Sequence, residues 1–154
     1  MSKELEEKAL KELKTVTINT SGYSVPAKKV DKRSVYISAD EDMHIVAIEH
    51  FIGVGKGQFS DNGHMLSKSP ENPWVKWEKP FGCAMEPTGT KGYFGYCGRD
   101  YYSEVSGSSD VIMYESFPSG YFLVKKGEKL YMHCYANPFE KEGVFHHKVC
   151  LIYW

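Results

Sequence analysis

The chain has 154 residues, about the length of one ordinary domain, and 42% of them are hydrophobic. Its 19 basic and 20 acidic residues give a net charge of −1, without the basic excess that nucleic-acid-binding proteins usually show. No apolar run approaches the ~18–20 residues that a membrane helix needs. We therefore expect no nucleic-acid partner and no membrane span.

The charged segment 1–14 predicts a short α-helix ahead of the main domain. Ser2 can cap its N-terminus, and Glu4 lies in the first turn, where negative charge is favoured. Its apolar side chains form one narrow stripe, which consists of Leu5, Ala9, Leu10 and Leu13. Because so short a helix is marginal in water, we expect the stripe to dock on its own sheet or on a neighbouring subunit, as an oligomerisation arm. The segment lacks the apolar stretch of a secretory signal.

From Thr15 onwards, short β-like runs alternate with Gly, Pro, Asn and Asp, and eleven Tyr and eight Phe add to the β tendency. The candidate strands are 15–18, 34–38, 43–52, 57–60, 64–66, 74–77, 93–97, 101–105, 111–115, 121–124, 129–136 and 144–153. Many short strands without intervening helices predict one mainly β domain over residues 15–154. We expect an antiparallel β-sandwich or jelly roll.

Three segments predict tight turns between these strands. Asp61-Asn62-Gly63 supplies the positive φ angles of a two-residue hairpin. Residues 117–120 place Pro second and Gly fourth in a turn, and residues 125–128 form another short reversal. The segment 43–52 is apolar on both faces, which predicts a central strand, and the apolar segment 144–153 predicts a paired inner strand.

Histidines near the end of the chain suggest a metal site. If residues 129–136 and 144–153 form a hairpin, His133 lies opposite His147, or opposite His146 after a one-residue slip. Cross-strand neighbours have Cβ atoms ~5 Å apart, close enough for two imidazoles to hold one transition-metal ion. A third ligand would come from another strand, such as His44 or His50. This alternative hypothesis is a metal-dependent enzyme or metal carrier.

Two short segments resemble pieces of the second cupin motif. They are Pro118-Ser119-Gly120 and the His-x-x-x-Asn pattern from His133 to Asn137. In cupins a histidine follows the Pro-x-Gly closely, whereas Leu123 stands there in this chain. The His-x-His pair of the other cupin motif is missing, so the sequence does not place the chain in that family.

The sequence lacks the spacings of several common reactive centres. It contains no Gly-x-Ser-x-Gly elbow and no Cys-x-x-Cys pair, which zinc ribbons and fingers require. A cysteine–histidine nucleophile pair stays open, because such partners lie far apart in sequence, and Cys97 is its best candidate. We expect four free thiols, at Cys83, Cys97, Cys134 and Cys150.

The segment 89–109 is the most distinctive part of the sequence, because it mixes tyrosines with glycines, serines and one arginine. Tyrosine and glycine together give adaptable loops with a large amphipathic contact area. The predicted binding surface consists of Tyr93, Tyr96, Arg99, Tyr101 and Tyr102, with Trp74 as a supplement. The same aromatic residues would also suit the interior of a sandwich.

We therefore predict a non-catalytic binding or assembly subunit without a cofactor and without catalytic residues. It would form a homo-oligomer or join a larger particle, and a virion decoration or appendage component is one instance. Its location would be cytoplasmic or virion-associated. The first alternative is a glycan-binding β-sandwich that uses exposed Tyr and Trp, and the second is the metal-dependent protein built on His133 with His146 or His147.

Overall fold

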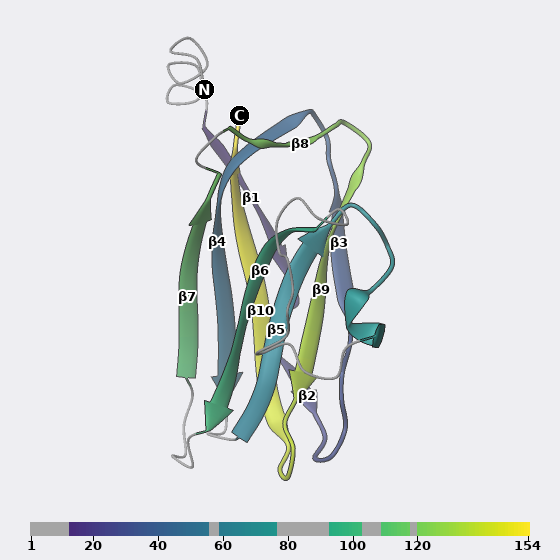
Figure 1. Cartoon of the computed structure of the whole chain (residues 1–154), viewed down its shortest axis with the longest axis vertical. Coiled ribbons are helices and arrows are strands. Elements are labelled where there is room, and N and C mark those ends of the chain that lie inside the picture. Colours follow the sequence, from purple (N-terminus) through teal and green to yellow (C-terminus); the bar gives the residue numbers. More distant parts are fainter. Residues whose placement is uncertain (1–12, 56–58, 77–92, 103–108, 118–119) are drawn as a thin grey trace.

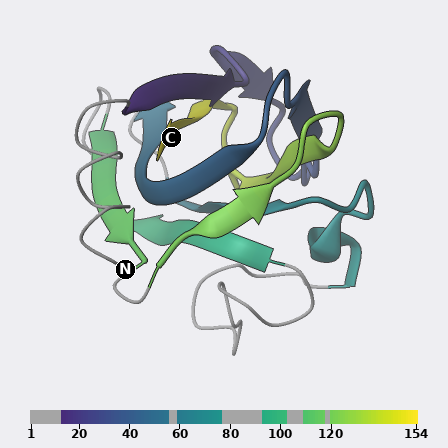
Figure 2. The same ribbon diagram turned by 90° about the horizontal axis from the view of Figure 1, so that it is seen from above.

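The computed structural model describes residues 13–55, 59–76, 93–102, 109–117 and 120–154. Within these ranges the chain forms two antiparallel sheets that pack face to face (Figures 1 and 2). Sheet A has the order β1-β10-β4-β7, and β2 and β8 pair with β10 and β4. Sheet B has the order β3-β9-β5-β6. The mainly β antiparallel sandwich that the sequence predicts is confirmed.

The strand bounds show how the chain alternates between the sheets. Sheet A contains β1 (Lys14–Asn19), β2 (Tyr23–Val25), β4 (Met43–Gly55), β7 (Ser109–Ser116), β8 (Phe122–Val124) and β10 (Gly143–Tyr153). Sheet B contains β3 (Ser34–Ser38), β5 (Phe59–Ser67), β6 (Tyr93–Tyr102) and β9 (Lys129–Asn137). A 3₁₀ turn, η1 (Pro73–Lys76), follows β5. This order of strands in two sheets is that of a jelly roll.

Two predictions about long strands are confirmed. β4 lies between β10 and β7, and β10 lies between β1 and β4, so both are inner strands of sheet A. Along β10 the inward positions are buried and the outward ones are half-buried, as expected for a strand with one face on the core. Two of the predicted turns close with main-chain hydrogen bonds, from Gly120 N to Phe117 O and from Glu128 N to Lys125 O.

The predicted hairpin of the last two strands is wrong. β9 pairs with β3 and β5 in sheet B, whereas β10 pairs with β1, β2 and β4 in sheet A. The connection after Asn137 therefore crosses from one sheet to the other. Because each strand finds two partners in its own sheet, pairing with segments far apart in the sequence replaces the local hairpin.

The chain also departs from local sequence signals at two other segments. Asp61-Asn62-Gly63 does not turn, because β5 runs through it and pairs on both sides, with β6 and with β9. Residues 73–76 form η1 instead of the predicted strand, and Trp74 covers the outer face of β9 there. In both places pairing and packing override the local tendency.

A bulge in β4 changes which side chains face the core. The register with β10 shifts so that Ile152 pairs with Ala47 and Tyr153 pairs with Ile45. The extra residue, Val46, makes both Ile45 and Ile48 buried, although strict alternation predicts them on opposite faces. His44 consequently lies on the other face from His50. It stacks on the indole of Trp154, with 3.9 Å between the ring centroids.

Candidate functional site

A layer of three histidines crosses the interior between two apolar clusters. One cluster includes Ile48, Leu66, Val149 and Leu151, and the other includes Ile52, Val54, Ala136 and Phe145. On β4, β5 and β10 the inward residue at the boundary is a histidine: His50, His64 and His147. All three side chains are fully buried. The strands of both sheets thus bring three imidazoles to one level of the core.

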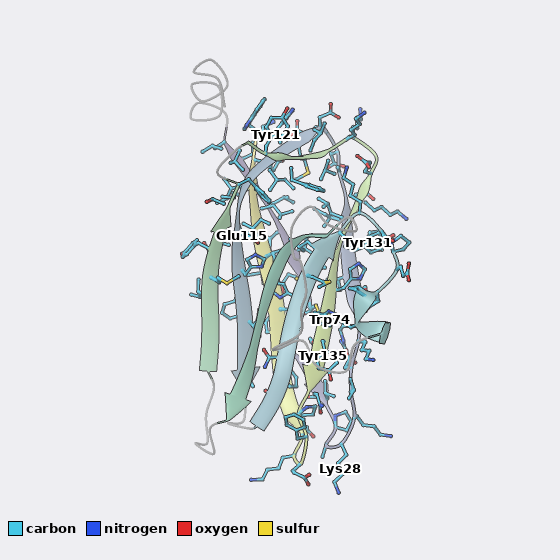
Figure 3. All side chains as sticks on the ribbon, viewed as in Figure 1. Lys28, Trp74, Glu115, Tyr121, Tyr131 and Tyr135 are labelled. Carbon is cyan, nitrogen blue, oxygen red and sulfur yellow. The ribbon has the colours of Figure 1, made fainter. Side chains whose placement is uncertain are left out.

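The three imidazoles form a continuous chain that ends on a carboxylate. His50 Nε2 lies 2.9 Å from Oε1 of Glu115, which comes from β7. His50 Nδ1 lies 2.9 Å from His64 Nε2, and His64 Nδ1 lies 3.0 Å from His147 Nδ1. Figure 3 labels Glu115 on β7, at the flank of the sandwich. Because β5 belongs to sheet B, the chain links the two sheets.

The position of each proton follows from the carboxylate end. A carboxylate only accepts hydrogen bonds, so His50 Nε2 donates to Glu115. A neutral imidazole has one donor and one acceptor nitrogen, so His64 Nε2 donates to His50 Nδ1. His147 Nδ1 then donates to His64 Nδ1, and the Nε2 of His147 keeps a lone pair.

Burial favours the neutral forms of these rings. It lowers the pKa of His64 well below the usual value of 6.5, and the neighbouring His50 and His147 lower it further. The pKa of His147 falls to about 3, chiefly by burial and then through His146, while Asp31 acts in the opposite direction. His64 and His147 are therefore uncharged at neutral pH.

Three buried polar atoms near this layer have no hydrogen-bond partner among the described residues. They are the hydroxyl of Tyr23, Oδ1 of Asn62 and Nε2 of His147. The ring of Tyr23 lies against that of His147, with 6.3 Å between the centroids, and the guanidinium of Arg33 covers the Tyr23 ring at 3.7 Å. The free end of the histidine chain is thus enclosed by aromatic and cationic groups.

The edge strand β7 carries the most apolar exposed surface that the structure describes on any strand. Its consecutive residues Ile112, Met113 and Tyr114 are 56%, 37% and 73% exposed. β7 pairs with β4 on one side, and no strand among the described residues pairs with its other side. An exposed apolar edge of this kind is a template for pairing with another chain.

Two other described edge strands are protected against such pairing. β1 carries Lys14, whose ammonium group pairs with Glu41 at 2.8 Å, and threonines at its outward positions. β3 is five residues long, and its exposed positions are serines apart from Tyr36. Short strands, lysines and polar residues are the usual means by which proteins blunt an edge. The central residues of β7, 112–114, include no lysine and no exposed small polar residue.

The structure does not bring the predicted metal ligands together. His133 lies on the outer side of sheet B, where its Nδ1 is 2.7 Å from Ser34 Oγ and its Nε2 is 2.9 Å from Ser67 Oγ. His147 lies in the core, and His146 on the other side of β10 contacts Asn19. In the part of the chain that the structure describes, no group of three His, Cys, Asp or Glu residues could hold a metal ion.

The prediction that Trp74 forms part of an exposed binding surface is wrong. The indole is fully buried, packs on Tyr135 and donates from Nε1 to the carbonyl of His133 at 2.8 Å. Figure 3 shows the labelled Trp74 and Tyr135 near each other beside sheet B. The other predicted surface residues lie on β6, and their side chains are outside the described part: Tyr93, Tyr96, Arg99, Tyr101 and Tyr102.

The predicted arm falls largely outside the described residues, since Leu5, Ala9 and Leu10 belong to segment 1–12. Leu13 is described and is exposed. The free thiols are confirmed for Cys134 and Cys150. Cys83 and the side chain of Cys97 lie outside the described part.

Sequence reasoning missed the histidine layer, although a signal for it was present. Each of the three histidines occupies an inward position of a strand, with an apolar inward residue two positions away on at least one side, such as Ile48 and Ile52 around His50. A histidine on an apolar face must find partners in the core. Three such strands pointed to a shared polar layer, but only the sheet order shows that their histidines meet.

No protein-family model matches the sequence, and no curated protein matches it. Among solved structures, the chain is similar to a decameric BFDV capsid protein. The identity is 9% and the TM-score is 0.43, over 92% of this chain and 98% of that chain. It is also similar to a chain of infectious bursal disease virus, Gt strain, at 7% identity and a TM-score of 0.41. That match covers 91% of this chain and 33% of the viral one.

A third similar structure is that of the T13 IBDV viral particle, at 7% identity and a TM-score of 0.42. The match covers 91% of this chain and 31% of that one. The chain thus spans about a third of the length of both of these viral chains. Within its described residues, the chain has no helix with the length and hydrophobicity needed to cross a membrane.

Proposed function

We propose that the chain is a non-catalytic assembly subunit that pairs with a second copy of itself along β7. The observation that supports this proposal is the run of exposed apolar residues at the centre of this edge strand, Ile112, Met113 and Tyr114. The two other edges whose side chains are described are polar or short. An antiparallel pair of identical strands is self-complementary, so it closes as a twofold dimer without further growth.

One register suits this pairing best. If the twofold axis passes at Met113, Ile112 of one copy lies opposite Tyr114 of the other, on the outward face. Aromatic and β-branched residues form favourable cross-strand pairs. In this register the acidic Asp110 and Glu115 of the two copies do not stand opposite each other, whereas a shift by one residue places them face to face. Like charges directly opposite are destabilising.

More specifically, we propose that the chain is a subunit of a larger particle, such as a virion decoration or appendage component. Jelly rolls occur in capsid and lectin domains, and an edge-paired dimer offers two copies of every other surface to such a particle. The predicted arm of residues 1–14 belongs to the same proposal as a second contact, through Leu5, Ala9, Leu10 and Leu13.

Sedimentation velocity over a range of concentrations tests the β7 dimer. We expect the wild-type chain to associate, and the double variant Ile112→Lys/Tyr114→Lys to weaken association at least about tenfold, because it places four ammonium groups at the shared edge. The matched control is Tyr36→Lys, since Tyr36 is the exposed tyrosine of edge strand β3 (54% exposed). This control should associate like the wild type.

Two results would overturn the proposal. One is a wild-type chain that stays monomeric at all concentrations near neutral pH. The other is equal weakening by Tyr36→Lys, because that result would show that association does not depend on β7. Circular dichroism of each variant confirms that the sheets are intact.

A further inference from the structure

We infer that the chain of Glu115, His50, His64 and His147 is an acid-sensitive clamp, which holds the β7 flank of sheet A against sheet B near neutral pH and opens on acidification. By loosening β7, acid would also weaken the proposed β7 dimer, and this part of the inference rests on the proposed function. The inference stands on the geometry of four buried or half-buried groups from four strands.

The clamp is complete with three protons. Its three contacts, of 2.9, 2.9 and 3.0 Å, each need one proton between the two atoms. Three neutral imidazoles supply those three protons, one each. The only remaining basic nitrogen of the three rings is Nε2 of His147, which has no partner among the described residues.

One additional proton can be taken up without breaking a contact. It binds Nε2 of His147, and the protons between the rings shift along the chain by one position. His147 Nδ1 then accepts from His64, and His64 Nε2 accepts from His50. The positive charge rests on His50, beside the carboxylate of Glu115, where it is best stabilised.

A second additional proton has no free lone pair to bind on the three rings. Wherever it binds between two rings, two N–H groups face each other across 2.9 or 3.0 Å, and two cations share a buried site. Such a contact is repulsive. The link between β5 in sheet B and the β4/β10 face of sheet A must then open. The lowered pKa values of His64 and His147 agree with this resistance to protonation.

β7 depends on this clamp more than the inner strands do. Met113, which lies opposite His50 in the register with β4, is exposed although it shares the inward face. Glu115 is the inward residue of β7 that bonds to the core, through His50, and its side chain is 19% exposed. Glu115 and His50 stay paired on acidification, but opening the link to β5 releases the flank of sheet A that they belong to. An edge strand with few buried apolar contacts opens at low cost, so β7 loosens first in that flank.

The other titratable or charged groups around the clamp come from several elements. Burial raises the pKa of Tyr23 and of the Cys134 thiol well above their usual values, and Arg33 stays charged beside Asp31. The remaining groups are His146 next to His147, Glu49 on the outer face of β4, and Cys97 and Arg99, which lie opposite His64 and Asn62 in the β5–β6 register.

Hydrogen exchange measured as protection factors at pH 7 and pH 5 tests the clamp in the full chain. We expect the protection of β7 amides in the wild type to fall at least about tenfold, while that of β1 amides stays constant. In the triple variant His50→Leu/His64→Leu/His147→Leu the protection of β7 should not depend on pH, because an apolar core replaces the titrating one. The control is His146→Gln, on the outer side of β10, which should behave like the wild type.

If the triple variant does not fold, the single variant His147→Asn takes its place, since its side-chain amide can donate near the position of Nδ1 but offers no lone pair for the first additional proton. The β7 protection of this variant should therefore fall further at pH 5 than that of the wild type. Sedimentation velocity at the same two pH values reports the dimer separately. Loss of β7 protection in a chain that is monomeric at pH 7 supports the clamp and contradicts the β7 dimer. Unchanged β7 protection in the wild type, or an equal fall in the leucine or asparagine variant, overturns the clamp.

Discussion

At the scale of single residues, buried histidines make the stability of the fold depend on pH. The pKa of His133 falls to about 4, because burial outweighs the hydrogen bond to the carbonyl of Ser69, and that of His147 falls to about 3. In the unfolded chain the value is near 6.5. Below pH 6.5 the unfolded chain therefore binds more protons than the folded one, so acid favours unfolding.

We expect the free energy of unfolding to be at its full value above pH 6.5 and to fall as the pH drops towards 4. Each buried histidine contributes a slope of about 1 kcal/mol per pH unit. Urea denaturation at pH 7.5 and pH 5.0 measures this loss. His133→Leu should reduce the slope by one histidine's share, because the Ser67 and Ser34 hydroxyls keep Ser69 and Asn72 as partners. An unchanged slope in this variant contradicts the prediction.

At the scale of elements, β10 is the strand on which sheet A depends. It pairs with β1 and β2 on one side and with β4 on the other. Leu151 is fully buried, and the main chain of Trp154 exchanges two hydrogen bonds with His44. Removing residues 151–154 should therefore abolish the folded state, as judged by the near-ultraviolet circular dichroism of the aromatic side chains.

Two substitutions on β10 show whether its inward face carries the stability that the truncation removes. Leu151→Ala should cost about 2–5 kcal/mol, which is the usual cost of removing a buried leucine side chain. Ile152→Thr changes the half-buried outward face of the same strand and should cost far less. A truncated chain that keeps the aromatic signal would contradict the central place of β10.

The strands also show which features of the structure can be predicted from the sequence alone. Apolar residues on both faces predict the central position of β4, and the nearly continuous apolar sequence of residues 144–153 predicts β10 as an inner strand. Alternation could not predict the bulge at Val46, which changes the inward set of β4, nor the covering of β9 by Trp74. Both depend on pairing between segments that are far apart in the sequence. The meeting of His50, His64 and His147 depends on the same long-range order, so the site was predictable only as three separate inward histidines.

At the scale of the whole molecule, the arm and the β7 edge are separable contacts. β1 begins at Lys14, so removing residues 1–12 leaves every described strand in place. We expect this truncated chain to fold and to shift to smaller species than the full chain, because the predicted apolar stripe is lost. Light scattering measures the mass distribution. An unchanged distribution would show that Leu5, Ala9 and Leu10 take no part in assembly.

The place of β10 between β1 and β4 also determines when the molecule can fold during its synthesis. Lys14 pairs with Tyr153, and Thr17 pairs with Cys150, so sheet A joins segments that lie far apart in the sequence. β1 has no partner for its inner edge until the ribosome has released β10. A topology with so high a contact order folds slowly. The nascent chain therefore carries β1 without its partner until residues 143–153 have emerged, and the jelly roll closes only after that point.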